Sequence, residues 1–123
     1  MANKRVLLID DEDDIREVAQ LSLEIVAQWD VLTASSGAAG ILCAAAEQPD
    51  AILLDVMMPD MDGRATFREL RANPATQHIP VILLTAKIHP SDQLARDVIA
   101  VISKPFDPLS LSTQISKHLG WTV

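Results

Sequence analysis

Cysteine and aromatic residues are scarce in this chain. Cys43 is the only cysteine among 123 residues, which excludes a disulfide within the chain and a metal site built from several cysteines. It lies in an alanine-rich helical segment, where we expect a small hydrophobic side chain that packs inward rather than a nucleophile. Two tryptophans and two phenylalanines, with no tyrosine, are too few to form a platform for stacking bases.

A basic surface and a long apolar run are missing as well. The formal net charge of −7 argues against nucleic acid as a direct partner, because nucleic-acid binding needs a positively charged face. No apolar stretch approaches the ~20 residues that cross a membrane, and no basic and apolar leader opens the chain. We therefore expect a cytoplasmic protein without a membrane partner, which would bind phosphate only through a mediating cation.

Short continuous apolar runs are what the chain does contain, and helix-length segments separate them. Such runs are typical of strands that are buried on both faces of a parallel sheet. Strands are predicted over residues 5–9, 31–34, 51–54, 80–84 and 99–102, and helices over about 14–29, 36–47, 63–72, 90–97 and 107–119. This alternation predicts one α/β domain over residues 1–123, with a doubly wound parallel sheet, right-handed crossovers and helices on both faces.

Hydrophobic periodicity and capping residues support the predicted helices. The first helix carries a stripe at i, i+3 and i+4 spacing that is predicted to face the core. The stripe consists of Ile15, Val18, Ala19, Ser22, Ile25, Val26 and Trp29. Ser36, with Ser35 before it, suits the cap of the second helix, and Pro90 suits the first turn of the fourth. Gly120 is expected to end the last helix.

Polar residues follow the ends of four predicted strands. Asp10 and Asp11 follow the first strand, and Asp55 follows the third. Thr85 and Lys104 follow the fourth and fifth. The carboxyl ends of parallel strands lie at one edge of the sheet, where ligands bind in such folds. We therefore expect three carboxylates, one hydroxyl and one amine to meet there.

Three carboxylates at adjacent strand ends repel one another. At an effective dielectric constant near 20, two charges ~4 Å apart repel by about 4 kcal/mol, so either a carboxylate is protonated or a cation lies among them. A few carboxylates with open water positions are the environment that Mg²⁺ prefers. With a lysine and a hydroxyl nearby, this arrangement favours attack by a carboxylate on a phosphoryl donor, whose oxygens the cation and the amine neutralise.

Four motifs in order resemble those of one known family. They are Leu8-Ile9-Asp10-Asp11-Glu12, Leu54-Asp55-Val56-Met57-Met58-Pro59-Asp60-Met61-Asp62-Gly63, Leu84-Thr85-Ala86 and Lys104-Pro105-Phe106. At these residues, and essentially from end to end, the chain resembles the receiver domain of two-component response regulators, the CheY-like family. The resemblance implies a flavodoxin-like sheet of five strands in the order 2-1-3-4-5. Gly63 fits the turn that enters the third helix.

The resemblance implies a role in phosphorelay signal transduction for the acidic residues. Asp55 would be the phosphoacceptor, which takes the phosphoryl group from the phosphohistidine of a sensor histidine kinase or a phosphotransfer protein. Asp11 and Asp55 would ligate Mg²⁺ directly, together with the backbone carbonyl of Met57. Asp10 would act on the metal mostly through water. The chain would thus be a phosphoprotein and a magnesium-binding protein, but not an enzyme beyond its own phosphorylation and dephosphorylation.

The resemblance also implies how the phosphoryl group is held and detected. Lys104 would pair with the phosphoryl group, and Thr85 would swing its hydroxyl to a phosphoryl oxygen beside the Ala86 amide. The bond before Pro105 would be cis. Phosphorylation would then switch the binding of a downstream partner, or dimerisation through the face formed by the fourth helix, the fifth strand and the fifth helix.

Three other functions compete with this interpretation. A Mg²⁺-dependent phosphatase of the haloacid-dehalogenase type needs a second aspartate two residues after the nucleophile, where this chain has Met57. A flavodoxin-like FMN binder needs a phosphate loop rich in Ser, Thr and Gly, where Asp10, Asp11 and Glu12 would repel phosphate. A degenerate receiver used only for docking or dimerisation would not need the complete acidic set with Lys104.

Two features depart from the pattern of the family, and a third is expected to determine the rate of self-dephosphorylation. Val101 stands where many receivers have Tyr or Phe, so no ring can turn inward when Thr85 moves. The segment from Thr85 to Lys104 is about three residues shorter than usual, which removes nearly one turn of the fourth helix. Met57 and Lys87 would flank the hydrolytic water, and neither offers an acceptor that orients it well, so we expect slow self-dephosphorylation.

Overall fold

A five-stranded parallel sheet forms the centre of the computed structural model, which describes residues 4–86 and 88–121. The strands are β1 (Arg5–Ile9), β2 (Asp30–Ala34), β3 (Ala51–Leu54), β4 (Val81–Thr85) and β5 (Ala100–Ser103). Their order is β2-β1-β3-β4-β5, and each neighbouring pair is parallel. The predicted α/β fold is confirmed, together with the strand order that the resemblance implied.

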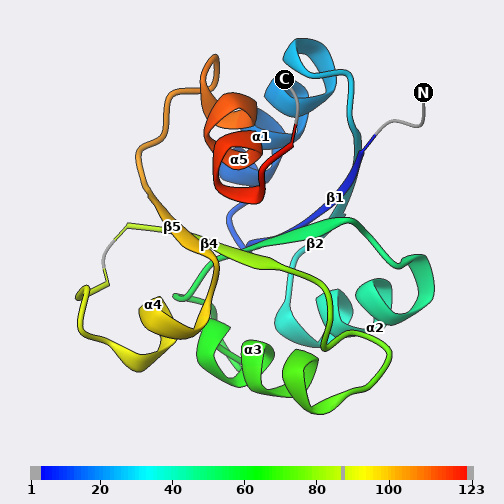
Figure 1. Cartoon of the computed structure of the whole chain (residues 1–123), viewed down its shortest axis with the longest axis vertical. Helices are drawn as coiled ribbons and strands as arrows, with labels where there is room; N and C mark the ends of the chain where they lie inside the picture. Colours follow the sequence, from blue (N-terminus) through cyan, green and yellow to red (C-terminus); the bar gives the residue numbers. More distant parts are fainter. Residues whose placement is uncertain (1–3, 87, 122–123) are drawn as a thin grey trace.

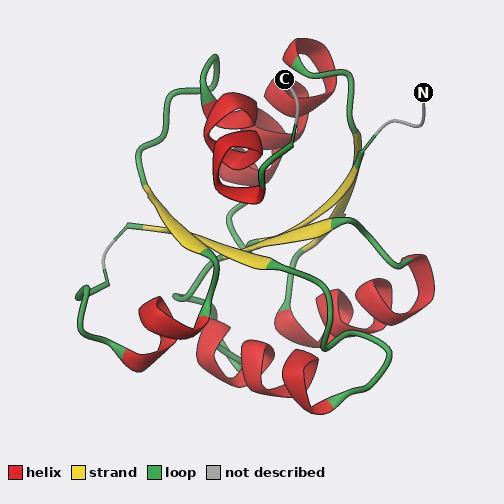
Figure 2. Ribbon diagram, in the orientation of Figure 1, coloured by secondary structure: helices red, strands yellow, loops and turns green. Residues whose placement is uncertain are grey.

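Helices cover both faces of the sheet. They are α1 (Asp13–Val26), α2 (Gly37–Glu47), α3 (Gly63–Ala72), α4 (Gln93–Asp97) and α5 (Leu111–Leu119). Figure 1 shows α1 and α5 on one face and α2, α3 and α4 on the other. The same three layers are seen by secondary structure in Figure 2. Within residues 4–86 and 88–121, none of the helices is both long and apolar enough to cross a membrane.

Alternate residues along each strand supply two hydrophobic cores, one on each face of the sheet. In β1, Leu7 and Ile9 belong to the core beneath α2, α3 and α4, whereas Val6 and Leu8 belong to the core beneath α1 and α5. All four side chains are 0% exposed. Complete burial of a side chain of this kind contributes about 1.5–3 kcal/mol. Burial on both faces is why the strands are continuous apolar runs rather than alternating ones.

The first helix differs from the prediction in its end and in its buried face. It ends at Val26 rather than at residue 29, because Gln28 adopts a left-handed φ of 59° before β2 begins. The buried residues are Ala19, Ser22 and Leu23, whereas Val18, Ile25 and Val26 are 43%, 73% and 45% exposed. The predicted stripe is therefore partly wrong. Val18, Ile25 and Val26 lie at the surface, whereas Leu23, which the stripe omitted, is buried, and Trp29 packs against the core beneath α1 and α5.

The fourth and fifth helices begin later than predicted. α4 begins at Gln93 rather than at residue 90, with Asp92 as its N-cap, so Pro90 precedes the helix. α5 begins at Leu111 rather than at residue 107, because the side chain of Asp107 accepts a backbone hydrogen bond in the preceding turn. Both errors have one cause, which is that an aspartate side chain stabilises a turn in competition with the helix.

Two predicted helix ends are confirmed by their geometry. Ser36 caps α2, and its side-chain oxygen accepts a hydrogen bond from the Ala39 N–H at 3.1 Å. Gly120 ends α5 with a left-handed φ of 71°, a conformation that glycine adopts without strain. Capping residues thus predicted these two ends from the sequence.

Candidate functional site

The carboxyl edge of the sheet brings the predicted polar residues together. Asp10 follows β1, Asp55 follows β3, Thr85 ends β4, and Lys104 follows β5. Backbone hydrogen bonds continue past the strand ends. The Asp55 N–H donates to the Ile9 carbonyl at 3.0 Å, and the Lys104 N–H donates to the Thr85 carbonyl at 2.9 Å. The sheet ladder itself therefore positions the backbone from which these side chains project.

Asp10, Asp11 and Asp55 form a compact acidic cluster. One carboxylate oxygen from each residue lies within 4.8 Å of the others. Asp10 is 0% exposed and Asp55 is 2% exposed, whereas Asp11 is half-buried. Charges that are this close and this poorly solvated repel strongly. The cluster therefore needs positive charge to remain ionised.

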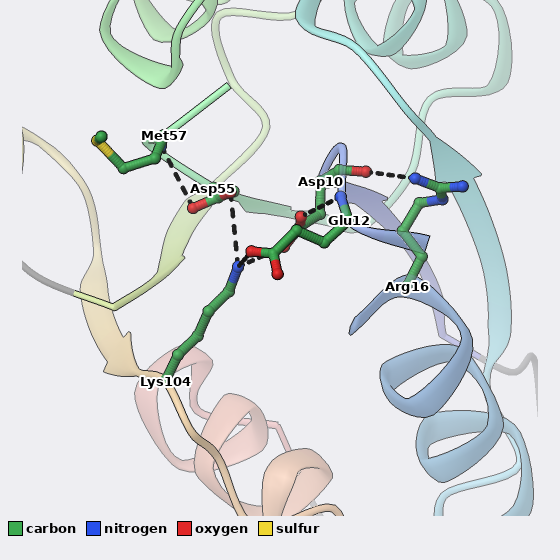
Figure 3. A network of polar contacts seen from close by, with 6 residues as sticks. All are labelled: Asp10, Glu12, Arg16, Asp55, Met57 and Lys104. Carbon is green, nitrogen blue, oxygen red and sulfur yellow. Dashed lines mark hydrogen bonds and ion pairs between the residues drawn. The ribbon is translucent and has the colours of Figure 1, made fainter. Parts of the chain in front are cut away.

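Lys104 supplies one positive charge to the cluster. Its Nζ lies 2.8 Å from Asp10 Oδ2 and 3.1 Å from Glu12 Oε1 (Figure 3). The distance to Asp55 Oδ2 is 3.5 Å, which is an ion pair too long for a good hydrogen bond. Burial lowers the pKa of Lys104, but the neighbouring carboxylates, Asp10 first, outweigh burial and raise the pKa above its ordinary value. One ammonium group thus pairs with three carboxylates, Asp11 adds a fourth to the cluster, and the site keeps a net negative charge.

The environment of Asp55 makes its carboxylate poorly stabilised. Burial raises the pKa of Asp55, and repulsion from Asp10 raises it further. Lys104 and the Met57 N–H, which lies 3.4 Å from Asp55 Oδ1, act in the opposite direction. The resulting pKa is about 6, compared with an ordinary value of 3.8. At neutral pH the group is ionised but weakly solvated, and this is the state that a nucleophilic carboxylate needs.

The raised pKa of Asp55 predicts a specific pH dependence of stability in the absence of metal. The folded protein binds this proton more tightly than the unfolded chain, so the ionised carboxylate destabilises the fold above pH 6 and this cost fades as the pH falls toward 4. Asp55→Asn removes the charge, and we expect it to stabilise the protein at pH 8. We expect this advantage to shrink by about 1 kcal/mol at pH 5. Urea unfolding with a chelator present measures the free energy of unfolding of both proteins at pH 8 and pH 5. An advantage of the variant that is equal at the two pH values would contradict the raised pKa of Asp55.

Buried oxygens without hydrogen-bond partners mark where ligands fit. In the described part of the chain they are Asp11 Oδ1, Asp55 Oδ2 and Thr85 Oγ1. Buried polar atoms are nearly always paired, so these oxygens are suited to partners from outside the chain. The two carboxylate oxygens suit a hard divalent cation such as Mg²⁺. The hydroxyl and the Lys104 ammonium suit the oxygens of a phosphoryl group.

The other residues singled out in the sequence lie around the cluster or away from it. Met57 is 72% exposed, Ala86 is exposed, and the peptide bond before Pro105 is cis. Lys87 lies outside the described residues. Cys43 is half-buried away from the cluster, and burial raises the pKa of its thiol, which disfavours the reactive thiolate.

Two residues that contact the cluster were missed in the sequence. The sequence predicts no separate role for Glu12, yet its carboxylate pairs with Lys104 and its N–H donates to Asp10 Oδ1 at 2.9 Å. Arg16, in the first turn of α1, donates a hydrogen bond to the Asp10 carbonyl oxygen at 2.8 Å. Helical spacing suggests a pair between residues 12 and 16, but Arg16 pairs with Asp13 instead, so the sequence offered no signal for either contact.

Gly63 is needed for a close approach of two backbone segments rather than for an unusual turn. A Cβ at this position would lie 2.5 Å from the Asp55 carbonyl oxygen and 2.7 Å from Val56 Cα. The Gly63 N–H donates to the Val56 carbonyl at 2.9 Å. The left-handed residue in this loop is Asp60, with a φ of 64°. Gly63 therefore lets α3 begin directly against the segment that carries Asp55.

Comparison with known proteins gives a consistent family. The family model described as the response regulator receiver domain matches residues 6–116. Response regulator PleD of Caulobacter vibrioides is 37% identical over 115 residues, which cover 90% of this chain and 25% of PleD. The alkaline phosphatase synthesis transcriptional regulatory protein PhoP of Bacillus subtilis is 34% identical over 120 residues, which cover 95% of this chain and 49% of PhoP. The chain thus spans a quarter to a half of these curated relatives.

Solved structures agree in fold. The chemotaxis response regulator CheY4 of Vibrio cholerae superposes with a TM-score of 0.86 at 27% identity, and the match covers 95% of this chain and 99% of CheY4. The receiver domain of the sensor histidine kinase PA1611 from Pseudomonas aeruginosa superposes with a TM-score of 0.81 at 26% identity, over 97% of this chain and 99% of that domain. That structure has a magnesium ion coordinated in the active site cleft.

Proposed function

The chain belongs to the family of response regulator receiver domains, and we propose that residues 1–123 act as one phosphoacceptor module. In this proposal Asp55 accepts a phosphoryl group, in a Mg²⁺-dependent reaction, from the phosphohistidine of a sensor histidine kinase or a phosphotransfer protein. The observation that carries the proposal is the buried Asp55 carboxylate, with a pKa raised to about 6, between two further acids and Lys104.

The side chains divide the work of phosphoryl transfer. A carboxylate oxygen of Asp55 forms the new O–P bond while the P–N bond of the phosphohistidine breaks and the imidazole nitrogen keeps the electron pair. Lys104 moves from Asp10 toward the phosphoryl oxygens and neutralises their charge. The Thr85 hydroxyl and the Ala86 amide donate hydrogen bonds to the same oxygens. Lys104 and Thr85 are suited to these roles because one is charged and the hydroxyl of the other has no hydrogen-bond partner among the described residues.

The acidic residues would hold the metal. We expect Asp11 and Asp55 to ligate Mg²⁺ directly with the Met57 carbonyl, and Asp10 to act through water. When bound, Mg²⁺ neutralises the charge on the transferring group. The unpartnered carboxylate oxygens and the net negative charge of the cluster support this assignment.

Receiver domains are signalling phosphoacceptors rather than enzymes that turn over a separate substrate. The haloacid-dehalogenase alternative is disfavoured by Met57, which replaces the second acid and is 72% exposed. A module used only for docking is disfavoured by the intact set of three acids and one lysine.

The acyl phosphate on Asp55 should be long-lived, because Met57 offers no group that orients the attacking water. The decay of label after removal of the phosphodonor measures its lifetime.

An apolar groove between α1 and the loop before α5 suits the protein that donates the phosphoryl group. The groove has a volume of about 280 Å³ and is lined by Val18, Leu21, Ser22, Ile25, Val26, Pro108 and Leu109. Ile25 is 73% exposed and Leu109 is 76% exposed, so the groove presents apolar side chains to solvent. Exposed apolar patches are typical of protein-binding surfaces. Both elements that line the groove lead away from the site, since α1 follows Asp10 and the loop before α5 follows Lys104. A protein donor that reaches Asp55 can therefore cover the groove with the same surface.

Phosphotransfer from two donors tests this proposal. With Mg²⁺, we expect label to pass to the chain both from a phosphorylated histidine kinase and from acetyl phosphate, and a chelator should prevent both reactions. Ile25→Glu places a charge in the groove and should slow transfer from the kinase about tenfold or more, with acetyl phosphate unaffected. Leu42→Glu is the matched control, because Leu42 is 74% exposed on α2, on the opposite face of the sheet. Equal slowing with both donors, or none with the kinase, would reject the groove as the docking surface.

Phosphorylation has to be transmitted from the site to a partner surface. The phosphoryl group brings close to two negative charges, so Thr85 and Lys104 shift toward it. Val101 is half-buried and has no ring that can follow Thr85. α4 has only five residues, three fewer than the helix predicted over residues 90–97. We therefore place the response in residues 86–97, and we expect it to bias partner binding or dimerisation on the face of α4, β5 and α5.

A charged contact connects this region to α3. Arg64 donates to both carboxylate oxygens of Asp92 at 2.6 Å and 2.5 Å, and Asp92 also accepts the Leu94 N–H at the start of α4. The hydrogen bond from Arg64 lowers the pKa of Asp92 the most, the Leu94 N–H lowers it further, and the resulting pKa is about 2.

Amide hydrogen exchange with and without beryllofluoride, a phosphoryl mimic, should show its largest changes in residues 86–97. Changes confined to α1 would reject this route.

A further inference from the structure

Arg16 reaches back from α1 to the loop that carries two of the three acids. One guanidinium nitrogen donates to the Asp10 carbonyl oxygen at 2.8 Å, and another pairs with the Asp13 carboxylate. The Arg16 side chain is 19% exposed, so most of it is removed from solvent. Figure 3 shows it directed toward Asp10 from the side opposite to Lys104.

The carbonyl that Arg16 binds belongs to the peptide group that joins Asp10 to Asp11. The other hydrogen bonds of Asp10 hold different atoms: its N–H donates to Ala34, and its carboxylate accepts from the Glu12 N–H and Lys104. Among the described contacts, none holds the Asp11 carboxylate, whose Oδ1 is buried and unpartnered. The direction of the Asp11 side chain therefore depends on the two peptide groups that flank it. The Asp10 carboxylate holds the one that follows Asp11, and Arg16 holds the one that precedes it.

We propose that Arg16 is a positioning residue of the metal site, which orients the Asp10–Asp11 peptide group so that the Asp11 carboxylate faces Asp55. The inference rests on the proposed function in that the cation is the one required for phosphorylation. The planar guanidinium holds two acceptors in a fixed geometry, which an ammonium group cannot do. Groups that orient metal ligands without touching the metal typically change its affinity by about 10–100-fold when they are removed.

Charge and geometry predict opposite effects here, and this makes the role testable. A guanidinium near a bound cation repels it, so removal of the charge alone would tighten binding of Mg²⁺. Loss of the positioning hydrogen bond would weaken it. We expect Arg16→Met to bind Mg²⁺ about tenfold more weakly and Arg16→Lys, which keeps the charge and one hydrogen bond, to lie between that variant and the unaltered protein.

The experiment measures the dissociation constant of Mg²⁺ by calorimetry, with no phosphodonor present, and amide exchange of residues 10–13 in the metal-free protein. Arg68→Met is the control, because Arg68 is exposed on α3 and its replacement changes the net charge by the same amount. Faster exchange at residues 10–13 and weaker binding in Arg16→Met, with both unchanged in Arg68→Met, would support the proposal.

Unchanged or tighter Mg²⁺ binding in Arg16→Met, or unchanged exchange of the loop, would overturn the assignment. Thermal unfolding of each variant identifies a general loss of structure, and Arg16→Lys provides the comparison if Arg16→Met is poorly folded. If the unaltered protein bound Mg²⁺ but accepted no phosphoryl group, the proposed function would fail while the role of Arg16 in the metal site would still stand or fall on these measurements.

Discussion

Asp55→Asn is expected to abolish phosphorylation of the chain by acetyl phosphate and by a phosphorylated kinase. The amide has nearly the shape of the carboxylate but carries no charge, and its oxygen is a far weaker nucleophile. Asp55 is 2% exposed and its pKa is raised to about 6, whereas the Asp10 carboxylate is bound by Lys104 and by the Glu12 N–H. Intact mass spectrometry should show one added phosphoryl group on the unaltered protein and none on the variant.

Asp14→Asn is the matched control for this experiment. Asp14 is an exposed residue in the first turn of α1, and the substitution removes the same charge outside the cluster. We expect this variant to be labelled at close to the unaltered rate. Full labelling of Asp55→Asn would show that another residue accepts the phosphoryl group, and the assignment of Asp55 would be wrong.

Gly63→Ala is expected to damage both the stability of the fold and the geometry of the site. The added Cβ would lie 2.5 Å and 2.7 Å from backbone atoms of residues 55 and 56, and backbone cannot move aside as a flexible side chain can. Overpacking of this kind costs about 1–3 kcal/mol. Because one of the crowded atoms is the Asp55 carbonyl oxygen, we also expect slower labelling by acetyl phosphate. Urea unfolding and the labelling rate are the two measurements.

Gly120→Ala separates the two effects. Gly120 has a left-handed φ of 71°, and no atom of the described residues lies within 4 Å of an added Cβ, so alanine there costs about 1 kcal/mol of stability from backbone strain. It lies at the end of α5, and we expect its labelling rate to be unchanged. If Gly63→Ala lost stability but kept the labelling rate, then its close contact would not position Asp55.

The strands and the site edge could be predicted because they depend on local sequence and on one general property of parallel sheets. Runs such as Val6–Ile9 and Ala51–Leu54 are apolar at every position, are short, and are separated by helix-length segments, which is typical of strands covered on both faces. Once the strands are parallel, their carboxyl ends share an edge. The meeting of Asp10, Asp55 and Lys104 follows from that geometry.

Helix boundaries were predicted less well, because local alternatives compete with the helix. Pro90 suits a first helical turn, yet Asp92 starts α4 three residues later through its own side-chain hydrogen bond. The stripe predicted on α1 was partly wrong for a related reason. Periodicity shows that Val18 and Ile25 are apolar, but it does not show where the covering element ends.

By itself, then, the sequence determined the alternation of strands and helices, the edge at which the acids gather, and the family to which the chain belongs. Only the tertiary structure decided the contacts that tune the site. Arg16 and Glu12 act through distances between loop atoms, and the pKa of Asp55 depends on burial and on a neighbour 45 positions earlier in the chain. Gly63 is required by a backbone approach that no local pattern encodes. Periodicity reports which face of an element is apolar, whereas electrostatics and steric contact depend on separations in space that only the packed chain defines.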